Sequence, residues 1–137
     1  MARKHAVLSA SSAARWIACP PSARLNAEKS DTPSEYAAQG TDAHTLCEYK
    51  LRKALGERVR DPTKKLSSYN SEMEECAEFY VQFVMGLVAQ FREERADTMV
   101  SVEQRVDFSD FVPDGFGTAD TLIISGKTVC IVDYKHG

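Results

Sequence analysis

The hydrophobic pattern of the chain changes its period near residue 98, and this change constrains the fold more than any other sequence feature. Before it, apolar residues recur every three or four positions, and after it they alternate with polar residues. A period near 3.6 predicts helices, and a period of two predicts strands. We therefore expect an α+β fold of the broad α/β class in a single domain, with helices in residues 1–97 packed on a mainly antiparallel three-stranded sheet in residues 98–137.

Caps and helix breakers divide the helical part. Ser11 or Ser12 can cap a short helix that Pro20-Pro21 ends, and Thr41 is a good N-cap for a longer one. We expect helices at residues 11–19, 22–28, 41–55 and 71–95, with a loop at 29–39 and a basic loop before residue 71.

The last of these helices has a clear apolar stripe. Ser71 and Glu74 form a capping-box pattern at its start. The residues expected to face the core are Phe79, Phe83, Leu87 and Phe91, with Val84 and Val88.

Turn residues divide the second part into three strands. We expect the first strand to run from residue 98 until the turn at Pro113-Asp114-Gly115, and the others to cover residues 117–124 and 128–135. A tight turn near Ser125-Gly126 would join the last two strands.

Composition limits the class of protein. The 137 residues contain 43% apolar residues, enough for one core without disulfides, and no apolar run is long enough to cross a membrane. Four scattered cysteines form no C-x-x-C pair, so we expect reduced thiols in a cytoplasmic protein with no membrane contact.

Charge is distributed unevenly along the chain. The formal net charge of −3 argues against a protein that binds nucleic acid by bulk charge alone. Residues 50–65, however, hold seven basic and two acidic side chains. This segment is either a solvated helix end and loop or a patch for a polyanion.

Two aspartates and a lysine form a candidate site on the last two strands. Asp133 and Lys135 are two residues apart in one strand and therefore project from the same face. A two-residue loop at Ser125-Gly126 would set Asp120 diagonal to Asp133, and a four-residue loop over 125–128 would set the two directly opposite. Both registers place the two carboxylates on one face.

A divalent cation would offset the repulsion between these carboxylates. Asp120 and Asp133, with the backbone carbonyl of Tyr134, would make an open Mg²⁺ or Mn²⁺ site. Lys135 beside it could position an attacking water or offset charge on a phosphate during phosphodiester hydrolysis. The plainer alternative is that the aspartates flank turns or pair with Lys135.

Polar residues also occupy one stripe of the expected helix at 41–55. His44, Glu48, Leu51 and Leu55 recur at spacings of four, three and four. His44 is either a half-buried structural histidine or a ligand that approaches the metal from the helix.

Three segments resemble a known family: GTDAHTLCE (40–48), GTAD (117–120) and VDYK (132–135). They are similar to the PD-(D/E)XK nucleases of the RecB-like branch, which includes CRISPR-associated RecB-like exonucleases. The opening LSASSAARWIACPPSARL (8–25) resembles the entry helix of the same branch, and the chain is most similar to a phage and prophage RecB-like group.

The resemblance implies roles for particular residues. Asp120 and Asp133 would be metal carboxylates, His44 a further metal ligand, and Lys135 the catalytic lysine. Glu48, one turn after His44, could orient the histidine or a water molecule, and Glu103 is a weaker acidic candidate.

The resemblance also sets expectations for the whole protein. It implies a Mg²⁺- or Mn²⁺-dependent deoxyribonuclease that acts on DNA with phage recombination proteins as partners. The helix that follows the lysine strand in this family is not in this sequence, so we expect a C-terminally truncated fragment with weak or no turnover.

Two details complete these expectations. Cys19 matches an early iron-sulfur cysteine of some relatives, but the late cysteine group is absent, so no cluster is predicted for this chain. The unprotected edge of the last strand predicts self-association into a homo-oligomer.

Two alternatives to a nuclease remain open. One is a non-catalytic DNA-binding or assembly module that retains the nuclease fold. The other is a cysteine and histidine site that binds zinc.

Overall fold

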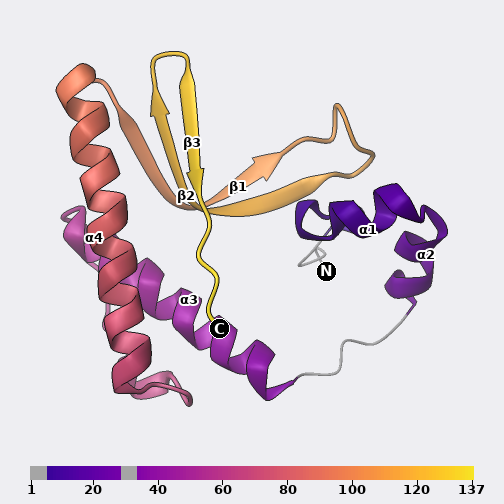
Figure 1. The fold of residues 1–137 in the computed structure, drawn as a ribbon, viewed down its shortest axis with the longest axis horizontal. Helices are drawn as coiled ribbons and strands as arrows, with labels where there is room; N and C mark the ends of the chain where they lie inside the picture. Colours follow the sequence, from indigo (N-terminus) through magenta and orange to yellow (C-terminus); the bar gives the residue numbers. More distant parts are fainter. Residues whose placement is uncertain (1–5, 29–33) are drawn as a thin grey trace. The chain divides into compact units, whose positions relative to one another are not determined.

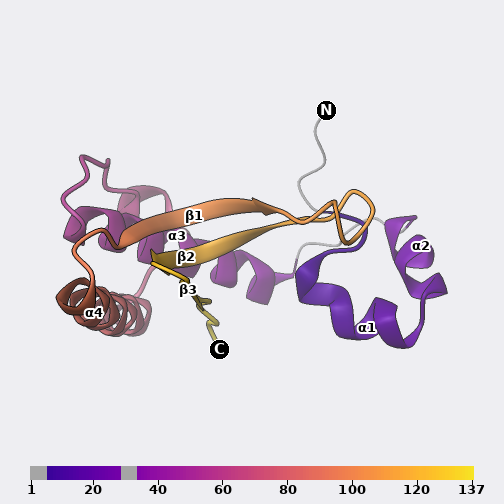
Figure 2. The same cartoon turned by 90° about the horizontal axis from the view of Figure 1, so that it is seen from above.

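The computed structural model describes residues 6–28 and 34–137. Helices and a three-stranded antiparallel sheet make up the fold (Figures 1 and 2), which confirms the predicted α+β class. The strands lie in the order β1 (Met99–Asp107), β2 (Phe116–Ser125) and β3 (Thr128–Val132). The described residues divide into two compact units, one of residues 6–28 with 105–118 and the other of residues 34–104 with 119–137. Among the described residues, no helix is both long and apolar enough to cross a membrane.

The first unit contains the short N-terminal helices, which lie where the sequence predicts them. A 3-10 turn, η1 (Ala10–Ser12), leads into α1 (Ala13–Ala18), and α2 (Pro21–Ala27) follows at once. Pro21 is the first residue of α2, the position where its missing N–H has no helical partner.

The predicted turn before β2 is also present in this unit. Asp114 has a φ of 54°, in the left-handed region. A Cβ on Gly115 would lie 2.6 Å from the Phe108 ring. Only glycine therefore fits at position 115, since any side chain there would overlap the ring.

Helix α3 (Glu35–Ala54) begins six residues before the predicted start at Thr41. Ser34 is the N-cap, and its hydroxyl accepts a hydrogen bond from the N–H of Ala37 at 3.1 Å. Thr41 lies inside the helix, and its hydroxyl donates back to the carbonyl of Ala37. The predicted start of the helix was wrong because Ser34 offers an earlier cap. A loop was predicted at 29–39, and its residues 29–33 lie outside the described part of the chain.

Helix α4 (Ser71–Glu94) starts as predicted, but its cap is Asn70, whose side chain accepts a hydrogen bond from the N–H of Met73. The predicted core stripe was wrong for Phe79 and Phe83, which are 73% and 52% exposed. The stripe that is buried consists of Met73, Ala77, Tyr80, Val84 and Val88. This helix is apolar on two adjoining stripes, and the buried one includes a small residue, Ala77, that allows close packing.

The sheet consists of β1 (Met99–Asp107), β2 (Phe116–Ser125) and β3 (Thr128–Val132). Ser125 pairs with Thr128 and Thr121 pairs with Val132, so the hairpin loop is Gly126-Lys127, one residue after the predicted Ser125-Gly126 loop. The register is the one predicted for the alternative loop over 125–128, in which Asp120 would face Asp133. Gly126 has a φ of 59°, which a two-residue hairpin loop requires and glycine allows. The ability of Gly126 to adopt a positive φ therefore sets the register of β2 against β3.

The core of the second unit lies between α3, α4 and the sheet. Leu46 and Leu51 of α3, Val84 of α4 and Ile123 of β2 are fully buried. After β3 the chain leaves the sheet and passes close to α3 (Figure 1), where the Tyr134 ring joins the core. This return of the last residues builds the candidate site.

Candidate metal centre

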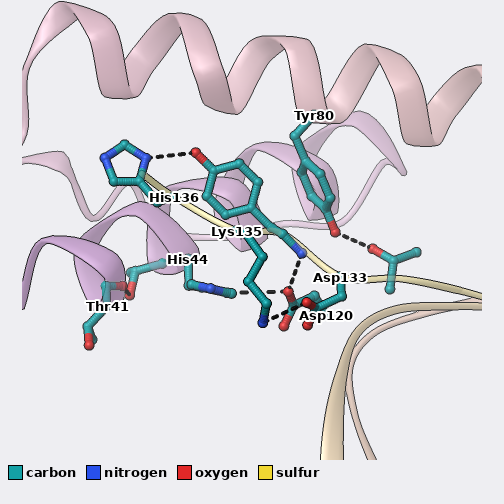
Figure 3. A network of polar contacts seen from close by, with 10 residues as sticks. Thr41, His44, Tyr80, Asp120, Asp133, Lys135 and His136 are labelled. Carbon is teal, nitrogen blue, oxygen red and sulfur yellow. Dashed lines mark hydrogen bonds and ion pairs between the residues drawn. The ribbon is translucent and has the colours of Figure 1, made fainter. Parts of the chain in front are cut away.

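His44 points from α3 to the sheet. Its Nδ1 lies 3.4 Å from Oδ2 of Asp120, and the two side chains are 34% and 14% exposed (Figure 3). The edge of the Tyr134 ring packs against the imidazole, with centroids 5.5 Å apart and planes at 85°. The hydrogen bond to Asp120 raises the pKa of His44 above its usual value, although burial opposes the shift.

Asp120 on β2 is held by a second hydrogen bond. The backbone N–H of Tyr134 donates to Oδ2 of Asp120 at 2.7 Å, just after β3 pairing ends at Val132. Continued pairing would have placed Asp120 opposite Asp133. Burial disfavours the carboxylate of Asp120, but the bonds from His44 and from the Tyr134 N–H outweigh it and lower its pKa.

Glu103 on β1 completes a cluster with these two residues. One ligand atom from each of His44, Glu103 and Asp120 lies within 4.8 Å of the others, and we call these three residues the metal cluster. Glu103 has a φ of 51°, which is rare for a non-glycine residue inside a strand. Burial, and then the charges of Asp120 and Glu48, raise its pKa.

The metal cluster fits a divalent cation. It borders a cavity of about 10 Å³, room for a single ion or water but for nothing larger. Two carboxylate oxygens and an imidazole nitrogen suit Mn²⁺, and also Mg²⁺ where water completes the coordination. Burial is the main cause of the raised pKa of Glu103, and the charges of Asp120 and Glu48 add to it; a cation would offset the repulsion among these carboxylates.

Asp133 and Lys135 lie beside the metal cluster but pair with each other. Lys135 Nζ lies 2.6 Å from Oδ2 of Asp133, and the side chains are 79% and 50% exposed (Figure 3). The hydrogen bond to Asp133 raises the pKa of Lys135, and the charge of Asp120 adds to the shift. Asp133 was expected as a metal ligand, but in the structure its carboxylate forms an ion pair with Lys135.

Glu48 pairs with Arg52, where the sequence predicted that it would orient His44 or a water molecule. Its Oε1 accepts a hydrogen bond from Nε of Arg52 at 2.8 Å, one helical turn further along α3. Glu48 lines the same cavity as the metal cluster, so it lies close enough to the site to act on it through charge.

Tyr134 contributes its N–H and its ring, where the sequence predicted its carbonyl as a ligand. The ring packs edge-on against Tyr80 and stacks on His136, whose Nδ1 lies 3.0 Å from the Tyr134 hydroxyl. Burial raises the pKa of Tyr134, so the phenol stays neutral. These contacts fix the segment that carries Asp133 and Lys135.

Sequence reasoning ranked Glu103 as a weak candidate and missed Arg52. A strand pattern gives no signal of a left-handed residue, so nothing indicated that Glu103 turns toward His44. Arg52 follows Glu48 by four residues, a spacing that does predict an ion pair on a helix.

One known protein family matches nearly the whole chain. The sequence profile of the family described as "Protein of unknown function (DUF2800)" matches residues 5–137. The chain belongs to the DUF2800 family. No solved structure matches this DUF2800 chain.

The basic segment of the DUF2800 chain is partly neutralised. Lys50 pairs with Glu74 and Glu78 of α4, and Arg52 pairs with Glu48 and Glu57. The remaining basic side chains form no ion pair with another residue in the described part of the chain: Lys53, Arg58, Arg60, Lys64 and Lys65.

The cysteines of the DUF2800 chain are free thiols. Cys47 borders the cavity of the metal cluster, but burial raises its pKa to about 12. A thiol that stays protonated near neutral pH is a poor metal ligand. Within the described residues, the cluster of three candidate ligands contains no cysteine, which gives a cysteine and histidine zinc site no support.

Proposed function

We propose that this DUF2800 protein is a DNA nuclease that hydrolyses phosphodiester bonds with Mg²⁺ or Mn²⁺. The observation that carries the proposal is the convergence of His44, Glu103 and Asp120 within 4.8 Å, next to the Asp133–Lys135 pair. These residues come from α3, β1, β2 and the segment after β3. A merely structural ion pair needs only two of them.

The metal cluster would hold the cation through the imidazole of His44 and the carboxylates of Glu103 and Asp120. A bound cation would supply positive charge to stabilise the phosphate in the transition state and would make a nearby water more acidic. Asp120 is already ionised and held in place by the Tyr134 N–H, so binding would require little rearrangement of this carboxylate.

Lys135 would contact the substrate phosphate. Its side chain is 79% exposed and carries a full charge, so a phosphate oxygen can displace Asp133 as its partner. The released Asp133 carboxylate would then be free to face the cation. The basic side chains of residues 53–65 would bind the DNA backbone further from the site.

The test is cleavage of labelled linear and single-stranded DNA by the whole gene product that carries this chain, with Mn²⁺ or Mg²⁺ supplied. We expect cleavage that EDTA stops and that Asp120→Asn and Lys135→Ala reduce by at least about a hundredfold. Asp97→Asn, at an exposed aspartate paired with Arg95, is the matched control and should leave the rate unchanged. Cleavage that survives both site substitutions would contradict the proposal.

A second candidate is a non-catalytic DNA-binding or assembly module with the same fold. The observation that favours it is the 2.6 Å pairing of Lys135 with Asp133, which leaves neither side chain free in the resting structure. This function predicts DNA binding that is unchanged by Asp120→Asn, with no cleavage under any metal. Phage recombination proteins are the partners that the sequence resemblance favours for either function.

A further inference from the structure

Arg52 joins three segments through one side chain. Its Nε donates to Glu48 at 2.8 Å, its Nη1 to Glu57 at 3.0 Å, and its Nη2 to the backbone carbonyl of Val102 at 3.0 Å. Glu48 belongs to α3, Glu57 to the loop after it, and Val102 to β1. The guanidinium is therefore a polar link between α3, which carries His44, and β1, which carries Glu103.

The hydrogen bond to the Val102 carbonyl lies directly before Glu103, a residue with an unusual backbone conformation. The Val102 carbonyl and the Glu103 N–H belong to one peptide plane, and the torsion φ of Glu103 begins at that plane. This φ is 51°, a conformation that costs a non-glycine residue about 1–2 kcal/mol and persists only where neighbours hold it. A hydrogen bond that fixes the peptide plane is such a restraint.

The left-handed turn at Glu103 also decides where its side chain points. In a regular strand, successive side chains alternate between the two faces of the sheet. Val102 is buried at 8% exposure, yet the neighbouring Glu103 still reaches the half-buried cavity that Val102 lines. Without the turn at 103, the two side chains would lie on opposite faces.

We propose that Arg52 is a positioning residue that holds the Val102–Glu103 peptide so that the Glu103 carboxylate faces His44 and Asp120. This inference rests on the proposed metal site. Arg52 itself touches neither the cation nor the substrate. A lysine cannot replace it, because a single ammonium does not span Glu48 and the Val102 carbonyl in a fixed fork.

The test measures Mn²⁺ affinity by electron paramagnetic resonance in the metal-free protein titrated with Mn²⁺. The variants are Arg52→Lys, Glu103→Gln and the double variant, each checked for folding by circular dichroism. We expect Arg52→Lys to weaken Mn²⁺ binding about tenfold and Glu103→Gln to weaken it at least as much. If Arg52 acts through Glu103, the double variant binds no more weakly than Glu103→Gln alone.

Two control variants separate this role from general ion pairing. Glu57→Gln removes the negative charge of a different partner of the same guanidinium, and Arg95→Lys changes an exposed arginine paired with Asp97. Both should bind Mn²⁺ like the unchanged protein. If Arg52→Lys fails to fold, Arg52→Gln, whose shorter amide cannot span Glu48 and the Val102 carbonyl, takes its place and should weaken Mn²⁺ binding in the same way.

A second readout needs no metal. Backbone scalar couplings and chemical shifts measured by NMR should report a positive φ at Glu103 in the unchanged protein and an extended backbone in Arg52→Lys. Unchanged Mn²⁺ affinity and unchanged φ in Arg52→Lys would overturn the inference, as would losses that simply multiply in the double variant. Failure of the unchanged protein to bind Mn²⁺ would instead overturn the proposed function, and the φ measurement would then decide the role of Arg52 by itself.

Discussion

Nδ1 of His44 lies 3.4 Å from a carboxylate oxygen of Asp120, and the same oxygen accepts the N–H of Tyr134. This single atom therefore joins α3, β2 and the last residues of the chain. Substitutions at these residues have effects on stability that can be separated from their effects on metal binding, because the contacts exist without a cation.

The His44–Asp120 pair should make metal-free stability depend on pH. The folded pKa of His44 is raised, so its contribution is complete below its unfolded value of about 6.5 and is lost as the pH rises through the folded value. The pKa of Asp120 is lowered, so the stability that Asp120 contributes is present above about pH 3.9 and is lost as the pH falls through its folded pKa.

We therefore expect His44→Gln to cost more unfolding free energy at about pH 5.5 than at about pH 8.5 in EDTA. The difference should be at most about 1 kcal/mol because His44 is a third exposed. Urea denaturation at the two pH values measures it. The dependence should vanish in an Asp120→Asn background, and a larger cost at the higher pH would contradict the assignment.

Glu103→Gly should stabilise the metal-free protein while removing metal binding. Glycine adopts a φ of 51° without a steric penalty, and the substitution also removes a carboxylate near Asp120. We expect a gain of about 1 kcal/mol in unfolding free energy. Ser101→Gly, in the same strand at an ordinary φ, is the control and should lose about 0.5–1 kcal/mol. Equal losses in both variants would count against a strained Glu103.

Tyr80→Phe should destabilise the protein through Thr121. The Tyr80 hydroxyl lies 2.7 Å from Oγ1 of Thr121, which is completely buried, so the variant leaves that oxygen without its partner. We expect a loss of about 1–3 kcal/mol in thermal or urea denaturation. Tyr69→Phe removes an exposed hydroxyl bonded to Glu74 and should change stability by less than about 0.5 kcal/mol. Similar small changes in both would show that the buried bond adds little.

Among the described residues no strand pairs with the outer edge of β3, and this edge should support self-association. β3 is the last strand in the sheet order, and its Val129 and Ile131 side chains are about 60% exposed. We expect light scattering over a concentration series to detect dimers or larger species, and Ile131→Lys to return them to monomer. Met99→Lys, equally exposed on β1 at the opposite side of the sheet, is the matched control. Monomer at every concentration would contradict this expectation.

The elements could be predicted from the sequence because local patterns determine them. The pattern change near residue 98 falls one residue before β1 begins at Met99, and the proline pair separates α1 from α2. The helix starts were harder. Ser34 and Thr41 are both chemically suitable caps, and only the packing of the helix against its neighbours decides between them.

Which apolar side chains are buried was only partly predictable. In α4 the periodicity at Phe79 and Phe83 is as regular as that at Tyr80 and Val84, so the sequence does not distinguish the two stripes. The difference lies in long-range partners: Tyr80 meets the hydroxyl of Thr121 on β2, 41 positions away.

Within the candidate site, residue spacing in the sequence predicted which side chains lie near one another but not which atoms form bonds. The sequence predicted Asp120 and His44, and the structure brings them together. The left-handed backbone of Glu103 was not predictable, because glutamate has no intrinsic preference for that region and adopts it only when tertiary contacts favour it.

The bond between Tyr134 and Asp120 has a consequence for how this segment can evolve. The donor is a main-chain group, so nineteen of the twenty amino acids could occupy position 134 and keep it, and proline alone would abolish it. The side chain at this position therefore matters for packing, since its ring contacts His44 of α3 and Tyr80 of α4. A substitution that removes the ring would leave the main-chain tether of Asp120 in place.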